Sequence, residues 1–197
     1  MTYYDPEALV RDALEESARV KQALRAGAPD IVRIASRIAD AFRAGGRLYA
    51  CGNGGSACDA MHLVEELVAR YKRERPGLPA QHFLDGATLT CWSNDYEFET
   101  VFSRQVEAFV RPGDVLVAIS TSGSSPNVLR AVEAARERGA LTVGLTGKDG
   151  GRMRELCEEA VVVPAEATER IQEAHITVIH LLCELVERTL FDDGASA

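Results

Sequence analysis

The 197 residues, 46% of them hydrophobic and 26% charged, suit one globular domain that can bury a sizeable core. The net charge of −8 argues against broad nucleic-acid binding, which normally needs a basic surface. No apolar stretch approaches membrane-spanning length, the first residues lack the features of a signal peptide, and the five cysteines form no C-x-x-C pair. We therefore expect a cytoplasmic protein with no membrane and no nucleic acid among its partners.

Two helices are expected within residues 1–45. The first opens at Asp5-Pro6, an N-cap aspartate followed by proline at the first helical position, and ends at Gly27. The second starts near Asp30 and stops at Gly45-Gly46. Joined by a short link, they are expected to form a helical hairpin that covers the sheet, contributes to an oligomer interface, or does both.

From residue 46 onward, short apolar runs alternate with helical stretches. The predicted strands are residues 48–51, 80–84, 114–119, 141–146 and 160–163, and the predicted helices are residues 57–73, 97–110, 126–137, 151–157 and 168–190. This alternation predicts an α/β fold with a parallel sheet covered on both faces. We expect a single domain over residues 1–197, with the α/β core and last helix in 46–191 and a frayed tail in 192–197.

A glycine-rich turn, Gly52-Asn53-Gly54-Gly55-Ser56, follows the first predicted strand and precedes a helix. A turn of this kind exposes backbone N–H groups at a helix N-terminus, which together bind anions. With Ala57 it also satisfies the dinucleotide fingerprint G-x-G-x-x-A. The acidic residue that would support this reading, Glu74, sits in a charged turn and does not end a strand. A nicotinamide-dependent oxidoreductase therefore stays as an alternative.

A second loop, Ser120-Thr121-Ser122-Gly123-Ser124-Ser125, follows the third predicted strand and precedes a helix opened by Pro126. Hydroxyl and N–H groups at a helix N-terminus favour a phosphate cradle, and the missing lysine argues against a nucleotide P-loop. The structural alternative is an ordinary turn with a capping serine. The position of the loop at the carboxyl end of a parallel strand favours a ligand site over an ordinary turn.

Two of the four histidines have neighbours that suit chemistry. His62 and Glu66 are four residues apart, so they share one face of a helix, and Gln172 lies two turns before His180 on the last helix. Two imidazoles, a carboxylate and an amide oxygen form a mixed N/O set for a divalent metal, for which zinc is plausible. The other two histidines are expected to be structural: His82 and His175.

A further polar cluster contains the dipeptide Asn94-Asp95. Such a pair is typical of a turn that caps the helix after it. Paired donors and acceptors also suit the hydroxyl groups of a sugar. Spacing does not decide between these two roles.

Over nearly its whole length the chain resembles the phosphoheptose isomerases, within the sugar isomerase (SIS) superfamily. The Ser-Thr-Ser-Gly loop at 120–123 marks the superfamily, and the combination of His62 and Glu66 with Gln172 and His180 points to the heptose branch. The resemblance rests on residues 51–56, 59–62, 65–67, 75–77, 94–95, 102–104, 120–123, 145–151 and 170–173.

The resemblance implies a three-layer αβα sandwich with a five-stranded parallel sheet, assembled as a homotetramer with active sites at subunit contacts. It implies an intramolecular oxidoreductase that converts sedoheptulose 7-phosphate to D-glycero-D-manno-heptose 7-phosphate through a cis-enediol, the first step of ADP- or GDP-heptose biosynthesis. A non-catalytic SIS module that binds sugar phosphates or bridges proteins is an alternative, although such relatives generally lack the His/Glu and Gln/His sets.

The resemblance also assigns the site residues. The phosphate is expected at Ser120, Thr121, Ser122 and Ser125, and the sugar at Asn53, Gly54, Gly55, Ser56, Asn94 and Asp95. One zinc ion per subunit is expected at His62, Glu66, Gln172 and His180. Glu66 and His180 are also expected to be the catalytic acid–base pair, and Glu66 and Gln172 to contact substrate.

Overall fold

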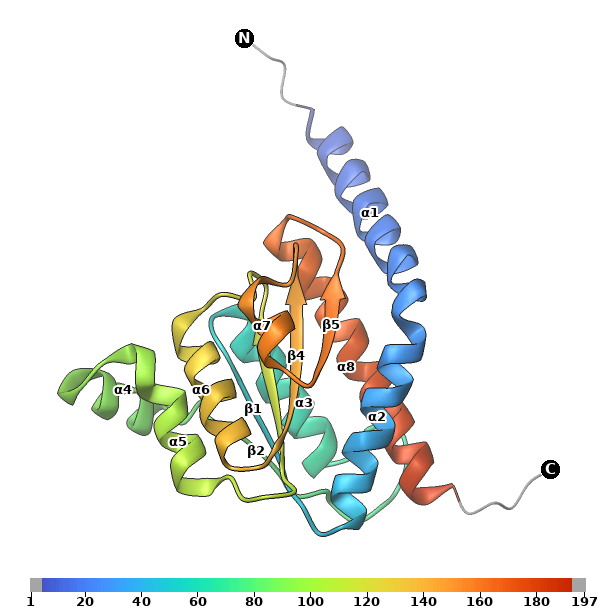
Figure 1. Cartoon of the computed structure of the whole chain (residues 1–197). Helices are drawn as coiled ribbons and strands as arrows, with labels where there is room; N and C mark the ends of the chain where they lie inside the picture. Colours follow the sequence, from blue (N-terminus) through green and yellow to red (C-terminus); the bar gives the residue numbers. More distant parts are fainter. Residues whose placement is uncertain (1–4, 193–197) are drawn as a thin grey trace.

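The computed structural model describes residues 5–192, so the expected tail lies outside the described residues except for Asp192 (Figure 1). Five strands form one parallel sheet in the order β2-β1-β3-β4-β5. The strands are β1 (Leu48–Gly52), β2 (Ala80–His82), β3 (Val115–Ser120), β4 (Leu141–Gly147) and β5 (Glu159–Val163). The helices are α1 (Pro6–Ala23), α2 (Ala28–Arg43), α3 (Gly55–Val68), α4 (Gly86–Asp95), α5 (Val101–Phe109), α6 (Pro126–Glu137), α7 (Gly151–Leu156) and α8 (Thr168–Phe191), with short 3-10 turns η1 (Leu24–Gly27) and η2 (Phe98–Thr100).

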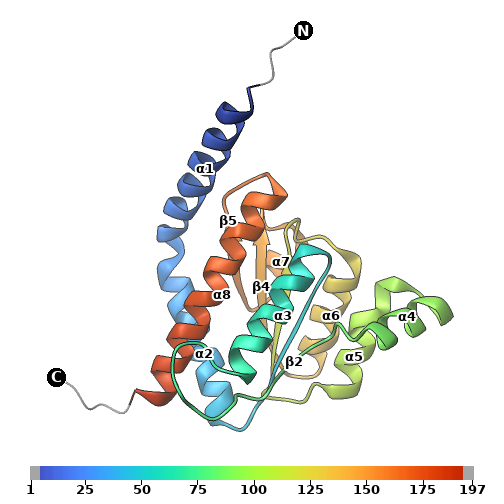
Figure 2. The same ribbon diagram turned by 180° about the vertical axis from the view of Figure 1, so that it is seen from behind.

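Helices cover both faces of the sheet, as expected for a three-layer sandwich (Figures 1 and 2). Successive side chains of a strand point to opposite faces. Leu48 and Ala50 of β1 therefore pack into one core with α2, α3 and α8, while Tyr49 and Cys51 pack into the other with α5, α6 and α7. Because both faces are covered, β1 and β3 are buried at every position, and the α/β fold class is confirmed.

The expected N-terminal hairpin does not form. Helix α1 continues through the η1 turn into α2 as one bent rod that runs along α8 (Figures 1 and 2). Gly27 does not reverse the chain, because its backbone (φ −85°, ψ 3°) stays close to helical values. Helix α2 buries Ile31, Ile34 and Ile38 against the core, whereas α1 buries only Val20 within its described length.

Two helix predictions were wrong in their bounds, and one helix was not predicted. Helix α3 ends at Val68, five residues before the predicted end, and the helix predicted over 97–110 begins as η2 before α5. Asp85 caps the start of helix α4 by accepting the Thr88 N–H with its side chain. Within the described chain, no residue of α4 is buried. The helix projects from the body beside α5, on the side of the sheet opposite α8 (Figure 1). Among the described helices, none has the length and apolar character needed to cross a membrane.

Candidate active site

Helices α3 and α8 lie side by side and run in the same direction (Figure 2). Gly55, the first residue of α3, lies against Gln172, and seven residues further along α3, His62 faces His180. On α8, the corresponding residues Gln172 and His180 are eight positions apart, which is about 12 Å along the helix axis. The turn after β1 and the start of the last helix therefore meet at one end of this helix pair, and the histidines meet at its middle.

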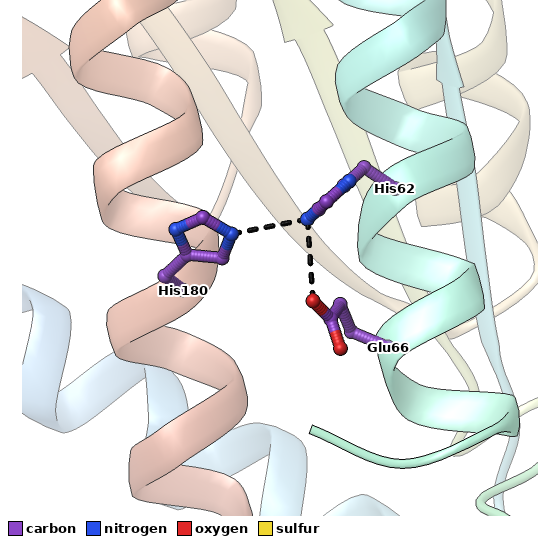
Figure 3. Close-up of side chains that lie close together, drawn as sticks. All are labelled: His62, Glu66 and His180. Carbon is purple, nitrogen blue, oxygen red and sulfur yellow. Dashed lines mark hydrogen bonds and ion pairs between the residues drawn. The ribbon is translucent and has the colours of Figure 1, made fainter. Parts of the chain in front are cut away.

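Three predicted residues converge between the two helices (Figure 3). His62 Nε2 lies 3.0 Å from His180 Nε2 and 3.3 Å from Glu66 Oε1. The His62 side chain is 39% exposed and that of Glu66 15%, so the cluster is open to a ligand on one side. Two facing ring nitrogens and a carboxylate oxygen make a site for a proton or a cation.

The geometry of this cluster fits a zinc ion. Ligand atoms at the usual Zn–N and Zn–O distances of about 2.0–2.1 Å lie about 3.3–3.4 Å apart in a tetrahedral site. The separations of 3.0 and 3.3 Å at His62 Nε2 are close to this value. The donor atoms of all three residues lie within 4.8 Å of one another.

Gln172, the fourth residue of the predicted set, packs at the start of α3. A Cβ atom at Gly55 would lie 2.6 Å from Gln172 Oε1, so the amide would have to move if this residue carried a side chain. Gly54 precedes it with a positive φ of 57°, and Ser56 is buried. The structure thus places the Gln172 amide against the predicted sugar-binding turn.

The hydroxyl groups of the second loop converge at the end of β3. Ser120 Oγ lies 3.0 Å from Ser125 Oγ and 3.4 Å from Ser122 Oγ, while Thr121 is half-buried beside them. Ser125 is the N-cap residue of α6, but its hydroxyl faces Ser120 and makes no capping hydrogen bond. The capping hydrogen bond of the structural alternative is therefore missing at Ser125, whereas Ser122 Oγ accepts the Ser124 N–H at 3.2 Å as in an ordinary turn. The hydroxyls of this loop are gathered at a helix N-terminus.

The turn after β1 and the serine loop after β3 are joined by a pair of amides, a contact that sequence reasoning missed. Asn53 Nδ2 donates to Asn127 Oδ1 at 2.8 Å, and Asn127 Nδ2 donates back to Asn53 Oδ1 at 2.9 Å. Asn127 is buried, and its Oδ1 also accepts the Val128 N–H. This pair fixes the turn after β1 against the start of α6. Only the position of Asn127, two residues after the serine loop, could have drawn attention to it.

Asn94 and Asp95 are the last two residues of α4, where they end a helix instead of capping the next one. Both are exposed, and Asn94 Nδ2 donates to Asp95 Oδ1 at 2.9 Å. Because α4 lies on the other side of the sheet from α3 and α8, the structure does not bring this pair to the His62 cluster of the same chain (Figure 1).

Two buried titratable groups border the site. Burial raises the pKa of Asp59 to about 6, although the charge of His62 opposes this, and Asp59 Oδ2 has no hydrogen-bond partner among the described residues. Burial lowers the pKa of His175 to about 4, and its Nε2 lies 3.1 Å from the Thr146 carbonyl oxygen. His175 thus has the structural surroundings expected of it, and His82 accepts the Leu84 N–H.

Fold and loops together define a sugar-phosphate domain of the SIS class: the SIS domain family matches residues 14–147. A phosphoheptose isomerase from Roseiflexus sp. is 52% identical over 93% of this chain and 94% of its own length. The structure of phosphoheptose isomerase from Neisseria gonorrhoeae superposes with a TM-score of 0.88 at 39% identity, covering 93% of this chain and 99% of that one. One from Francisella tularensis gives 0.91 at 32% identity, covering 94% and 100%. The chain belongs to the phosphoheptose isomerase family.

Proposed function

We propose that this protein is an aldose–ketose isomerase that interconverts sedoheptulose 7-phosphate and D-glycero-D-manno-heptose 7-phosphate in the cytoplasm. The observation that carries the proposal is the convergence of His62 and Glu66 from α3 with His180 from α8, within a chain 52% identical to a phosphoheptose isomerase. The five free cysteines are compatible with a reducing compartment. The reaction would open a heptose biosynthetic sequence.

Isomerisation moves a proton from C1 of the ketose to C2 of the aldose, and protons must also move between the two oxygens. We assign the carbon proton to Glu66 and the oxygen protons to His180. Glu66 Oε1 faces His62, which leaves the other carboxylate oxygen for the proton. His180 holds a ring nitrogen at the same point, and imidazole exchanges protons readily near neutral pH.

Zinc is the proposed cofactor, one ion per subunit, at His62, Glu66 and His180, the three residues that converge. Gln172, the predicted fourth ligand, would have to leave its contact with Gly55 to join them. When bound, zinc would supply positive charge where the substrate oxygens become negative. The protein's own contribution is to hold the two helices at the spacing that these ligand atoms need.

The two loops would bind the rest of the substrate. Ser120, Thr121, Ser122 and Ser125 would hold the phosphate with the N–H groups at the start of α6. The turn from Asn53 to Ser56 would line the sugar beside Gln172.

We further propose a homotetramer with active sites at subunit contacts. Helix α1 extends beyond the body and exposes Leu9, Val10 and Leu14 at 57–67%, an apolar surface that a second subunit would cover. Asn94 and Asp95, remote from the His62 cluster of their own chain, would then serve a neighbouring subunit's site.

The decisive experiment follows sedoheptulose 7-phosphate by NMR in heavy water, with and without a chelator. We expect an aldose carrying deuterium at C2, loss of turnover with chelator and recovery with added zinc. Complete retention of substrate hydrogen in the aldose would indicate an intramolecular hydride shift and contradict the proton-transfer assignment. Binding without turnover in the zinc-loaded protein would favour the non-catalytic module.

A further inference from the structure

One buried carboxylate fastens the segment after α3 to α8. Glu187 lies seven residues, about two turns, after His180, and its side chain is 2% exposed. Its Oε1 accepts the Tyr71 N–H at 3.0 Å and Arg75 Nε at 2.8 Å, and its Oε2 accepts the Lys72 N–H at 3.1 Å. Both carboxylate oxygens are therefore occupied by groups from residues 71–75.

Arg75 extends the same network to the end of α3. Its side chain is 1% exposed. Its Nη2 donates to the Glu66 carbonyl oxygen and its Nη1 to the Leu67 carbonyl oxygen, each at 2.8 Å. These carbonyl groups belong to the last turn of the helix, where intrahelical donors run out. The ion pair thus holds the backbone of Glu66 and the helix that carries His180 in one rigid unit.

The ring of Tyr71 completes the arrangement. It stacks on the His180 imidazole with centroids 5.7 Å apart and planes 22° apart. The His180 ring also meets the His62 ring edge-on, with ring centroids 5.1 Å apart and an angle of 66° between the ring planes. His180 is thereby held between a face and an edge, with its Nε2 directed at His62 (Figure 3).

We propose that Tyr71, anchored by the buried Arg75–Glu187 pair, is a positioning residue for His180. The tyrosine ring fixes the plane of the imidazole, and the ion pair fixes the ring and the end of α3. Tyr71 itself transfers no proton. The inference rests on the proposed role of His180.

The ring, and not the hydroxyl group, carries this role, so Tyr71→Phe and Tyr71→Leu form a matched pair. In the full-length, zinc-loaded protein, Tyr71→Phe should keep kcat within about twofold. Tyr71→Leu should lower kcat about 10- to 100-fold while KM changes little, because misplacing a reacting group by about 1 Å has effects of this size. Thermal unfolding of both variants shows that the protein remains folded.

A second readout does not depend on turnover. In protein labelled at histidine, the ring protons of His180 are shielded by the stacked tyrosine, and His180→Gln assigns their resonances. We expect Tyr71→Leu to move these resonances downfield and Tyr71→Phe to leave them in place. Glu187→Gln, which weakens the anchor but keeps the ring, should move them in the same direction as Tyr71→Leu.

The two readouts separate the possible failures. Equal kcat values for the Leu and Phe variants would overturn the proposal, as would unchanged His180 resonances in Tyr71→Leu. A wild-type protein without isomerase activity but with the expected resonance shifts would instead contradict the proposed function and leave the stacking contact established.

Discussion

The amide pair that joins the turn after β1 to the serine loop allows a stability change to be worked out from individual bonds. Three hydrogen bonds end on the Asn127 side chain, two exchanged with Asn53 and one from the Val128 N–H. Asn127→Leu keeps the size of the side chain but removes all three. At about 1 kcal/mol each, the loss is about 3 kcal/mol. In a chain of this length that lowers Tm by about 6–12 °C.

A double-mutant cycle with Asn53→Leu tests where this energy comes from. Two of the three bonds join Asn53 to Asn127, so each single variant loses both of them. The double variant loses the same two bonds only once. The two single losses should therefore exceed the double loss by about 2 kcal/mol in urea unfolding. Losses that add within about 0.5 kcal/mol would refute the reasoning. In kinetics, either single variant should raise KM for the sugar phosphate more than it lowers kcat, since the pair aligns the two loops that are proposed to bind the substrate.

Three further expectations concern single positions. Glu66→Gln and His180→Gln should each lower kcat by about two to four orders of magnitude with an unchanged circular dichroism spectrum, and near-normal turnover in both would contradict the acid–base assignment. Gly55→Ala should displace the Gln172 amide and raise KM, whereas Gly55→Ala with full activity would show that the amide can move freely. The pKa of Asp59 is raised to about 6 in the folded state, so folding stability should fall as pH rises from about 4 to about 6. Asp59→Asn should remove that fall and stabilise the protein at pH 7 by up to about 3 kcal/mol in urea unfolding. If the variant and the wild-type protein had the same dependence of stability on pH, Asp59 would not be its cause.

Local patterns predicted β1 and β3 well because these two central strands are buried on both faces. The runs at 48–51 and 114–119 are almost entirely apolar, which matches β1 and β3 within one residue at each end. The serine loop was recognised because strand, hydroxyl groups and proline follow one another in the chain. The pairing of His62 with Glu66 likewise needed only the period of a helix.

The errors came from contacts between distant segments. Helix α3 was predicted to run to residue 73, but Glu187 accepts the N–H groups of Tyr71 and Lys72 that a longer helix would have used. Helix α4 buries no residue within the described chain, so it has no apolar stripe by which to recognise it. The roles of Tyr71 and Asn127 depend on residues more than seventy positions away, for which a single sequence offers no signal.

The parallel placement of α3 and α8 also bears on how the protein is made. His62 and His180 are 118 residues apart, and all the strands that follow β1 are synthesised between them. During translation, α3 emerges long before α8, the helix that packs beside it and whose residues share a buried core with Leu63 and Leu67. Two of the three proposed zinc ligands, His62 and Glu66, are synthesised before the third, His180. The proposed zinc site is therefore complete only once α8 has packed against α3, and its occupation should report that this packing has occurred. A release of zinc would then be among the first signs that α8 has come away.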